Sequence, residues 1–238
     1  MPEGLIAGIG LTHLTVYDQR PGPDGVHSGC PHVHAVTDEA YYVLAGTGAI
    51  DLHDAAHGFR SVPLAPGSYV QFTPGTLHRA VNQGGLTVLA VMGNAGLAER
   101  GDARVWFGPE VDADPAAYER LWRLPAKKGL EGALERRDRA VVAYLELLRL
   151  WREDCAAYAA ELARFVDLHA REMAARRETF AHVVEDGPAG WLAAVTARLD
   201  GLPAGPADSD AAAVDAADEA PKLGMCGLLR PLDHRHSV

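Results

Sequence analysis

The stretch that decides the fold is PHVHAVTDEAYYVLAGTG, residues 31–48. It places two histidines one residue apart, His32 and His34, and a glutamate at Glu39. In an extended strand, residues two apart project to the same face, so the two imidazoles point to one side. Glu39 is an odd number of positions from His34, so the chain must turn or bulge near Thr37 for the carboxylate to join them. Two imidazoles on one face suit a transition metal, and the stretch therefore predicts a metal site on a strand.

A second stretch, GSYVQFTPGTLHRAVN at residues 67–82, supplies a third histidine, His78. This side chain must reach the metal from a separate strand. Short β-branched or aromatic runs, separated by glycine, proline and aspartate, extend over residues 1–107. Many short strands at close spacing predict a sandwich or barrel.

Together the two stretches resemble the two motifs of the cupin superfamily. The first has HxH, four residues, Glu39, six residues and Gly46, and the second has Gly75, two residues, His78, three residues and Asn82. The resemblance covers residues 10–95 and implies a mainly β jelly-roll, the cupin double-stranded β-helix barrel. The ligands that it implies for one divalent transition metal are His32, His34, Glu39 and His78.

The chain departs from these motifs at two turns. Gly25 lies one position too far ahead of HxH, and Thr73 stands where the second motif has a proline. Neither departure removes a metal ligand.

The second half of the chain has a different character. Asp114 and Pro115 form a helix start, and no glycine or proline occurs from Ala133 to Asp186. One helix of that length would span roughly 80 Å. We therefore expect a break near residues 167–178 and a helical hairpin, followed by a short helix over residues 188–199.

These patterns predict three regions. A cupin barrel with the metal site occupies residues 1–110, and a helical region for packing or dimerisation occupies residues 111–200. Residues 201–238 are expected to form a flexible acidic linker and a C-terminal tail, whose last, more apolar part is free either to dock on the body or to remain apart.

Composition excludes several classes of protein. The net charge of −10 argues against nucleic acid and anionic membranes as partners, both of which attract basic patches. No apolar run has the ~18 residues of a spanning helix, and the first residues lack a signal-peptide pattern. The three cysteines are odd in number and widely spaced, which favours reduced thiols in a cytoplasmic protein.

Two further residues are candidates for the pocket wall. Tyr41 has the strand parity of Glu39, so it either lines the pocket and contacts a substrate or fills the barrel. Asn82 has the parity of His78, so it either orients a ligand or closes a turn.

Three imidazoles and one carboxylate leave open positions on an octahedral metal. With Fe²⁺, the first choice, this favours a dioxygenase-type oxidoreductase acting on a small molecule. With Mn²⁺, Zn²⁺ or Ni²⁺ as the metal, an oxygen-independent isomerase or lyase is the alternative, and Cu²⁺ is a further possible metal. A non-catalytic ligand-binding or regulatory cupin is another. In each case we expect a homodimer, since a long apolar helical stripe favours pairing.

Overall fold

Ten strands and six α-helices make up the part of the chain that the computed structural model describes, residues 4–202 and 220–232. The strands are β1 (Gly10–Val16), β2 (His27–Ser28), β3 (His32–His34), β4 (Glu39–Asp54), β5 (Gly58–Leu64), β6 (Tyr69–Phe72), β7 (Leu77–Met92), β8 (Ala103–Val105), β9 (Lys222–Leu223) and β10 (Gly227–Leu232). Eight of the ten precede residue 110, as the sequence predicts.

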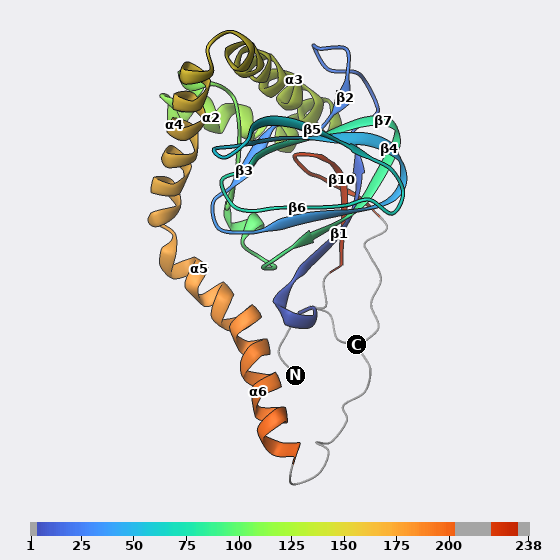
Figure 1. Ribbon diagram of the computed structural model, residues 1–238, viewed down its shortest axis with the longest axis vertical. Coiled ribbons are helices and arrows are strands. Elements are labelled where there is room, and N and C mark those ends of the chain that lie inside the picture. The colour runs from blue at the N-terminus through green and yellow to red at the C-terminus, as the bar shows by residue number, and fades with distance from the viewer. Residues whose placement is uncertain (1–3, 203–219, 233–238) are drawn as a thin grey trace.

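The helices follow the first eight strands and cover one side of the barrel (Figure 1). They are α1 (Pro109–Asp112), α2 (Pro115–Trp122), α3 (Leu124–Glu153), α4 (Cys155–Ala174), α5 (Arg177–Val184) and α6 (Gly190–Gly201), with short turns η1 (Ile6–Gly8), η2 (Ala98–Arg100) and η3 (Glu185–Ala189). Within the described ranges, no helix combines the length and apolar composition needed to cross a membrane.

The sheet is antiparallel and is organised around β4 and β7. Its longest path of paired strands is β5-β4-β7-β1-β10-β9. Tyr41 and Val43 are buried in the barrel core, whereas Tyr42 and Leu44 between and beside them are exposed. This alternation is the period of two expected for a strand with one face in the core, and it confirms the mainly β prediction.

The glycine that ends the first motif permits a close approach between the two long strands. Gly46 has a φ of +74°, and a Cβ atom there would lie 2.2 Å from the carbonyl oxygen of Gly85. The pairing of β4 with β7 shifts register on both sides of this point. Only glycine fits, because the conformation is left-handed and the neighbouring backbone leaves no space.

The end of the chain completes the barrel sheet. β10 pairs antiparallel with β1, with Leu11 opposite Leu232 and Val16 opposite Gly227. The apolar part of the segment that we expected as a tail therefore docks on the body, the possibility that the sequence left open. The acidic linker expected at residues 203–219 lies outside the described residues.

The helical region contains the expected hairpin. Its turn is at Asp154, upstream of the break that we expected, and the Asp154 carboxylate caps α4 by accepting a hydrogen bond from the backbone N–H of Ala157. A second break, at residues 175–176, separates α4 from α5 within the expected range. Figure 1 shows α4, α5 and α6 following one another along the side of the barrel, with α6 extending beyond it.

A buried polar network joins the hairpin to the barrel. His53 of β4 contacts two tyrosine hydroxyls through its ring nitrogens, with Nε2 2.8 Å from Tyr144 of α3 and Nδ1 2.9 Å from Tyr158 of α4. The hydroxyl of Tyr144 also donates to the carboxylate of Asp51. Burial lowers the pKa of His53 to about 3 from an ordinary 6.5.

Acidification is expected to weaken the fold through His53. The imidazole takes up a proton near pH 6.5 in the unfolded chain but only near pH 3 in the folded one, so stability falls as the pH drops through this window. We expect the wild type to lose about 2 kcal/mol more unfolding free energy between pH 7.5 and pH 5 than His53→Gln, which removes this titration. Urea unfolding of both proteins at both pH values measures the difference, and equal losses would contradict the assignment.

Candidate metal centre

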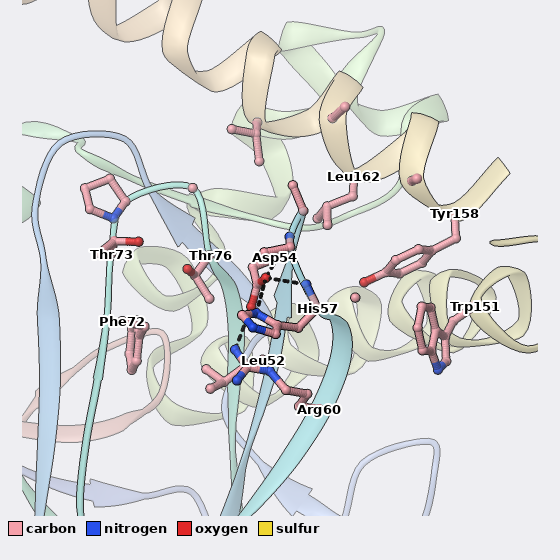
Figure 2. Close-up of a pocket in the computed structure, with 18 of the residues that line it drawn as sticks. Leu52, Asp54, His57, Arg60, Phe72, Thr73, Thr76, Trp151, Tyr158 and Leu162 are labelled. Carbon is pink, nitrogen blue, oxygen red and sulfur yellow. Dashed lines mark hydrogen bonds and ion pairs between the residues drawn. The ribbon is translucent and has the colours of Figure 1, made fainter. Parts of the chain in front are cut away.

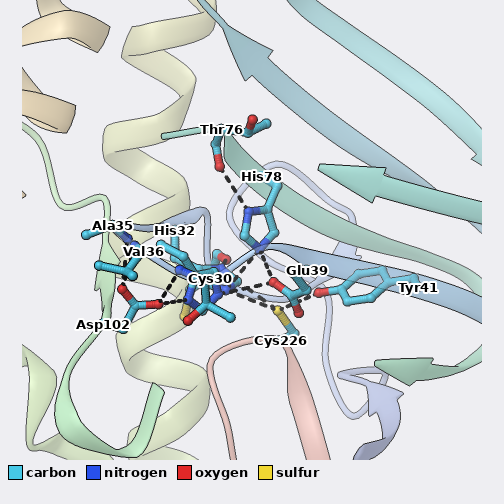
Figure 3. A network of polar contacts seen from close by, with 12 residues as sticks. Cys30, His32, Ala35, Val36, Glu39, Tyr41, Thr76, His78, Asp102 and Cys226 are labelled. Atoms are coloured by element: carbon cyan, nitrogen blue, oxygen red, sulfur yellow. Dashed lines mark hydrogen bonds and ion pairs between the residues drawn. The ribbon is translucent and has the colours of Figure 1, made fainter. Parts of the chain in front are cut away.

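The four predicted ligands converge inside the barrel (Figure 3). His32 and His34 come from β3, Glu39 is the first residue of β4, and His78 is the second residue of β7. One ligand atom from each side chain lies within 4.8 Å of all the others. All four residues are buried, and none is more than 6% exposed.

The bend expected between His34 and Glu39 is present and is held by a carboxylate. β3 ends at His34 and β4 begins at Glu39, so the parity of the strand is interrupted between them. The carboxylate of Asp102 accepts hydrogen bonds from the backbone N–H groups of Ala35 and Val36, at 3.1 and 2.8 Å. This bend turns the glutamate to the same side as the two histidines.

Backbone carbonyls fix the tautomers of two imidazoles. Nδ1 of His32 lies 3.0 Å from the carbonyl oxygen of Cys30, and Nδ1 of His78 lies 3.1 Å from that of Thr76. A carbonyl oxygen only accepts, so each Nδ1 carries a proton, and Nε2 is the ring atom directed at the cluster. These two Nε2 atoms face each other at 3.0 Å. Either a proton or a bound metal ion between them would remove the repulsion of their lone pairs.

His34 lies between two carboxylates. Its Nδ1 is 3.2 Å from Asp102 Oδ2, and its Nε2 is 3.1 Å from Glu39 Oε2. Burial opposes the charged ring, but the two carboxylates outweigh this effect and raise the pKa of His34 to about 9. Burial, with the neighbouring imidazoles of His78 and His34, holds the pKa of His32 well below its usual range. In the absence of a metal, the ring of His34 is therefore protonated, whereas the ring of His32 resists protonation.

Glu39 completes the donor set. Burial alone raises its pKa, but the imidazoles of His34 and His78 hold the pKa of this carboxyl well below its usual range. Its Oε2 lies 3.1 Å from Nε2 of both rings and yet receives no hydrogen bond of good geometry. Three imidazoles and an ionised carboxylate form a cluster that could bind a divalent metal, which would replace the Nε2 proton of His34.

Tyr41 lies beside this cluster in the barrel core. Its side chain is fully buried, and its hydroxyl is 3.4 Å from Sγ of Cys226. That sulfur is 3.9 Å from both ring nitrogens of His32. Burial, together with the charge of Glu39 and the thiol, raises the pKa of Tyr41 well above its ordinary value. The phenol is therefore a neutral hydrogen-bonding group beside the cluster.

Asn82 contacts backbone groups. Its amide nitrogen donates to the carbonyl of Val16, and its oxygen accepts from the N–H groups of Gly84 and Leu86. The structure thus places this side chain at the bend of β7 and leaves it out of the group formed by the four ligands.

Two supporting residues were missed in the sequence. Asp102 is 63 positions from Glu39, in a loop whose sequence carries no motif, and it is fully buried against His34. Its backbone carbonyl in turn accepts a hydrogen bond from Nε2 of His169 in α4. Cys226 arrives in the turn before β10. No local sequence pattern marks either residue, because the contacts of each with the cluster depend on how distant segments pack.

Replacing Asp102 is expected to weaken metal binding without removing it. Asp102→Asn cannot accept the His34 Nδ1 proton through the same anionic oxygen, so the ring loses its orientation and part of its basicity. We expect the metal affinity to be about 10–100-fold lower, as when other residues that hydrogen-bond to a metal-binding side chain are replaced. Competition with a chromophoric chelator measures this affinity. Asp38, an exposed residue that directly precedes Glu39, provides the control, and Asp38→Asn should bind the metal with wild-type affinity.

The comparisons with known proteins concern the barrel. A family model described as "Cupin domain" matches residues 20–92. No curated protein sequence matches the chain. Similar solved structures include CapF with the inhibitor 3-isopropenyl-tropolone, at 18% identity and TM-score 0.29, over 36% of this chain and 25% of that one.

Two other solved structures come from named organisms. A predicted oxalate decarboxylase from Thermotoga maritima is 31% identical over 31% of this chain and 57% of its own, with TM-score 0.25. WlaRA from Campylobacter jejuni, named a TDP-fucose-3,4-ketoisomerase, is 12% identical over 39% and 64%, with TM-score 0.32. The chain thus spans less than two thirds of each of the three proteins. Residues 20–92 thus match a cupin domain and fold, with both histidine motifs, as part of one antiparallel barrel, which is followed by an additional helical region.

Proposed function

We propose that this protein binds one divalent transition metal through His32, His34, Glu39 and His78 and acts on a small molecule. The observation that carries the proposal is the convergence of Nε2 of His32, Nε2 of His78 and Oε2 of Glu39, with the two nitrogens 3.0 Å apart and the carboxylate oxygen 3.1 Å from His78. This oxygen is buried and receives no hydrogen bond of good geometry, an arrangement that a bound cation would stabilise. Within the described residues, the barrel supplies this arrangement at its core.

The reaction that we propose is a dioxygenase-type oxidation dependent on Fe²⁺. An iron(II) ion held by these four ligands would keep open coordination positions and supply the redox chemistry. The residues of the chain perform the remaining tasks. Asp102 holds the proton on His34 Nδ1, the carbonyls of Cys30 and Thr76 do the same for the other two rings, and buried Tyr41 helps to exclude water.

The decisive experiment combines metal analysis with oxygen consumption. The protein is purified without added metal, its bound metals are quantified, and oxygen uptake is followed with small enols, thiols and catechols after reconstitution with Fe²⁺. Near-stoichiometric iron and substrate-dependent uptake would support the proposal. Substoichiometric iron with no uptake would refute it. Turnover without oxygen would instead identify an isomerase or lyase, and a thermal shift without turnover would identify a ligand-binding protein.

We also propose how the regions of the chain divide this work. Residues 1–110 carry the metal, and residues 111–200 serve packing and homodimer formation. The support for dimer formation is on α6, where Leu192, Val195 and Leu199 are each at least 52% exposed at spacings of three and four residues. Such spacing suits a helical partner, and light scattering would give the oligomeric state.

The cellular setting that we propose is the cytoplasm. All three cysteines of the sequence lie in the described part of the chain and are unpaired, as expected in a reducing compartment.

A further inference from the structure

A cavity of about 870 Å³ lies where the helical region meets the barrel (Figure 2). Four segments form it, which are the end of α3 at Trp151, the face of α4, the hairpin joining β4 to β5, and the turn joining β6 to β7. The volume is within the range of small-molecule binding sites.

The floor of this cavity is also the wall of the metal centre. Phe72 lines the cavity, and its ring centroid is 4.3 Å from that of His78. Thr76 lines the cavity as well, and its carbonyl oxygen fixes the His78 tautomer. Leu52, also in the lining, pairs with His78 across β4 and β7. One layer of side chains, chiefly the 6%-exposed Phe72, therefore separates the cavity from His78 of the metal centre.

The chemistry of the lining is mainly apolar. Besides Phe72, the cavity is lined by Trp151, Tyr158, Leu162 and Val166, a set that offers ring faces and aliphatic groups. Such surfaces favour ring-containing molecules, because apolar area is removed from water and aromatic faces stack.

The charged groups of the lining neutralise one another. Asp54 accepts hydrogen bonds from Arg60, at 2.6 Å, and from Nδ1 of His57, at 3.0 Å. The exposed Asp167 adds an acidic group from α4. The cavity therefore has no excess of cationic groups with which to hold a phosphate.

The wall formed by α4 is fixed in place before any ligand arrives. Tyr158 is 3% exposed, and its hydroxyl contacts His53 of the barrel. On the barrel side, Gly58 lies under the ring of Trp151, where a Cβ atom would be 2.3 Å from the indole. These close contacts fix the distance between the two helices, α3 and α4, and the β4–β5 hairpin, as in a preformed site.

We propose that this cavity binds the molecule on which the metal centre acts, and that it selects a mainly apolar, ring-containing compound over a sugar phosphate. The assignment of the ligand as a substrate rests on the proposed function. Phe72 is the side chain that such a molecule must displace to reach the metal. The helical region thus forms half of the binding site.

The first test measures binding of 1-naphthol, a neutral two-ring probe, by its fluorescence. Ala163 lines the cavity, and exposed Ala160 is on the same helix outside the lining. We expect Ala163→Phe to raise the dissociation constant at least tenfold by filling the cavity, while Ala160→Phe changes it less than twofold. Equal affinities for wild type and Ala163→Phe would overturn the assignment of the site. Tighter binding of glucose 6-phosphate than of 1-naphthol, measured by calorimetry, would overturn the proposed class of ligand.

The second test connects the cavity to the metal. In metal-loaded protein, 1-naphthol should slow extraction of the metal by a chelator severalfold, and Ala163→Phe should abolish this protection. Phe72→Leu should speed extraction severalfold, whereas Tyr69→Leu, on the exposed face of the same strand, should leave it unchanged. No protection, or no effect of Phe72→Leu, would contradict a shared wall.

Failure of the proposed function is read separately. Wild-type protein that holds no metal would contradict the metal centre. The 1-naphthol titration is carried out on the metal-free protein, so it tests the cavity whether or not the protein binds a metal.

Discussion

Replacing His34 by alanine should abolish stoichiometric metal binding. The side chain supplies one of four candidate donors, and among the three rings it alone has a carboxylate, Asp102, as the partner of its Nδ1. Without it, Glu39 also loses an imidazole neighbour at 3.1 Å. We expect affinity to fall by more than about a hundredfold, the upper limit of what loss of a supporting partner costs. Elemental analysis of protein reconstituted with Fe²⁺ and then desalted measures the loss.

The control for His34→Ala is another histidine on the same chain. His182 on α5 is 78% exposed in its side chain, so His182→Ala should retain the full metal content of the wild type. If His34→Ala retains stoichiometric metal, the four-residue assignment is wrong. Circular dichroism of both variants separates loss of metal from loss of fold, because the barrel has an apolar core that does not depend on the ligands.

A chain that ends at Pro221 should be severely destabilised. It lacks β9 and β10, so β1 loses a six-residue ladder of pairs, and the buried Cys226 leaves a cavity against Tyr41. Arg136, 4% exposed, also loses the carbonyl of Gly224 that it contacts at 2.7 Å. Each net hydrogen bond contributes about 1 kcal/mol and a buried side chain about 2–5 kcal/mol, so we expect a loss of about 5 kcal/mol or more. That loss is comparable to the whole stability of many domains.

Complementation provides the control for this truncation. A synthetic peptide of residues 220–238, added in excess, should raise the thermal midpoint of the shortened protein by mass action, and a scrambled peptide should not. Thermal unfolding by circular dichroism follows both. A shortened chain that unfolds at the wild-type midpoint would show that the β1–β10 pairing contributes little.

Two of the candidate metal ligands could be predicted because their pattern is local. His32 and His34 occupy alternate positions of one strand, where strand geometry alone directs both rings to one face. Glu39 and His78 needed the family resemblance, since their parity and their separate strands do not by themselves bring them together. The need for glycine at position 46 appeared only when the backbone of Gly85 was found against it.

The helical hairpin was predicted with its turn in the wrong place. Composition showed an uninterrupted stretch from Ala133 to Asp186, but the chain turns at Asp154, where a side-chain cap starts α4. A capping aspartate in the middle of a helical pattern is a weak signal when glycine and proline are absent. In the structure, Phe165 and Leu162 of α4 share a buried cluster with Trp106, a contact between distant segments that no local pattern records.

The sequence by itself determined the mainly β first half, the common face of His32 and His34 and the presence of a helical second half, because strand alternation and helical periodicity are properties of short segments. Glu39 and His78 joined the candidate metal site through the resemblance of the two motifs to a known family. Only the tertiary structure decided that Asp102 supports His34, that Cys226 returns from the far end of the chain, and that α4 and the barrel enclose a cavity beside Phe72. These features join residues tens to nearly two hundred positions apart. Their contacts arise from the burial of apolar surface between whole elements, which no local pattern records.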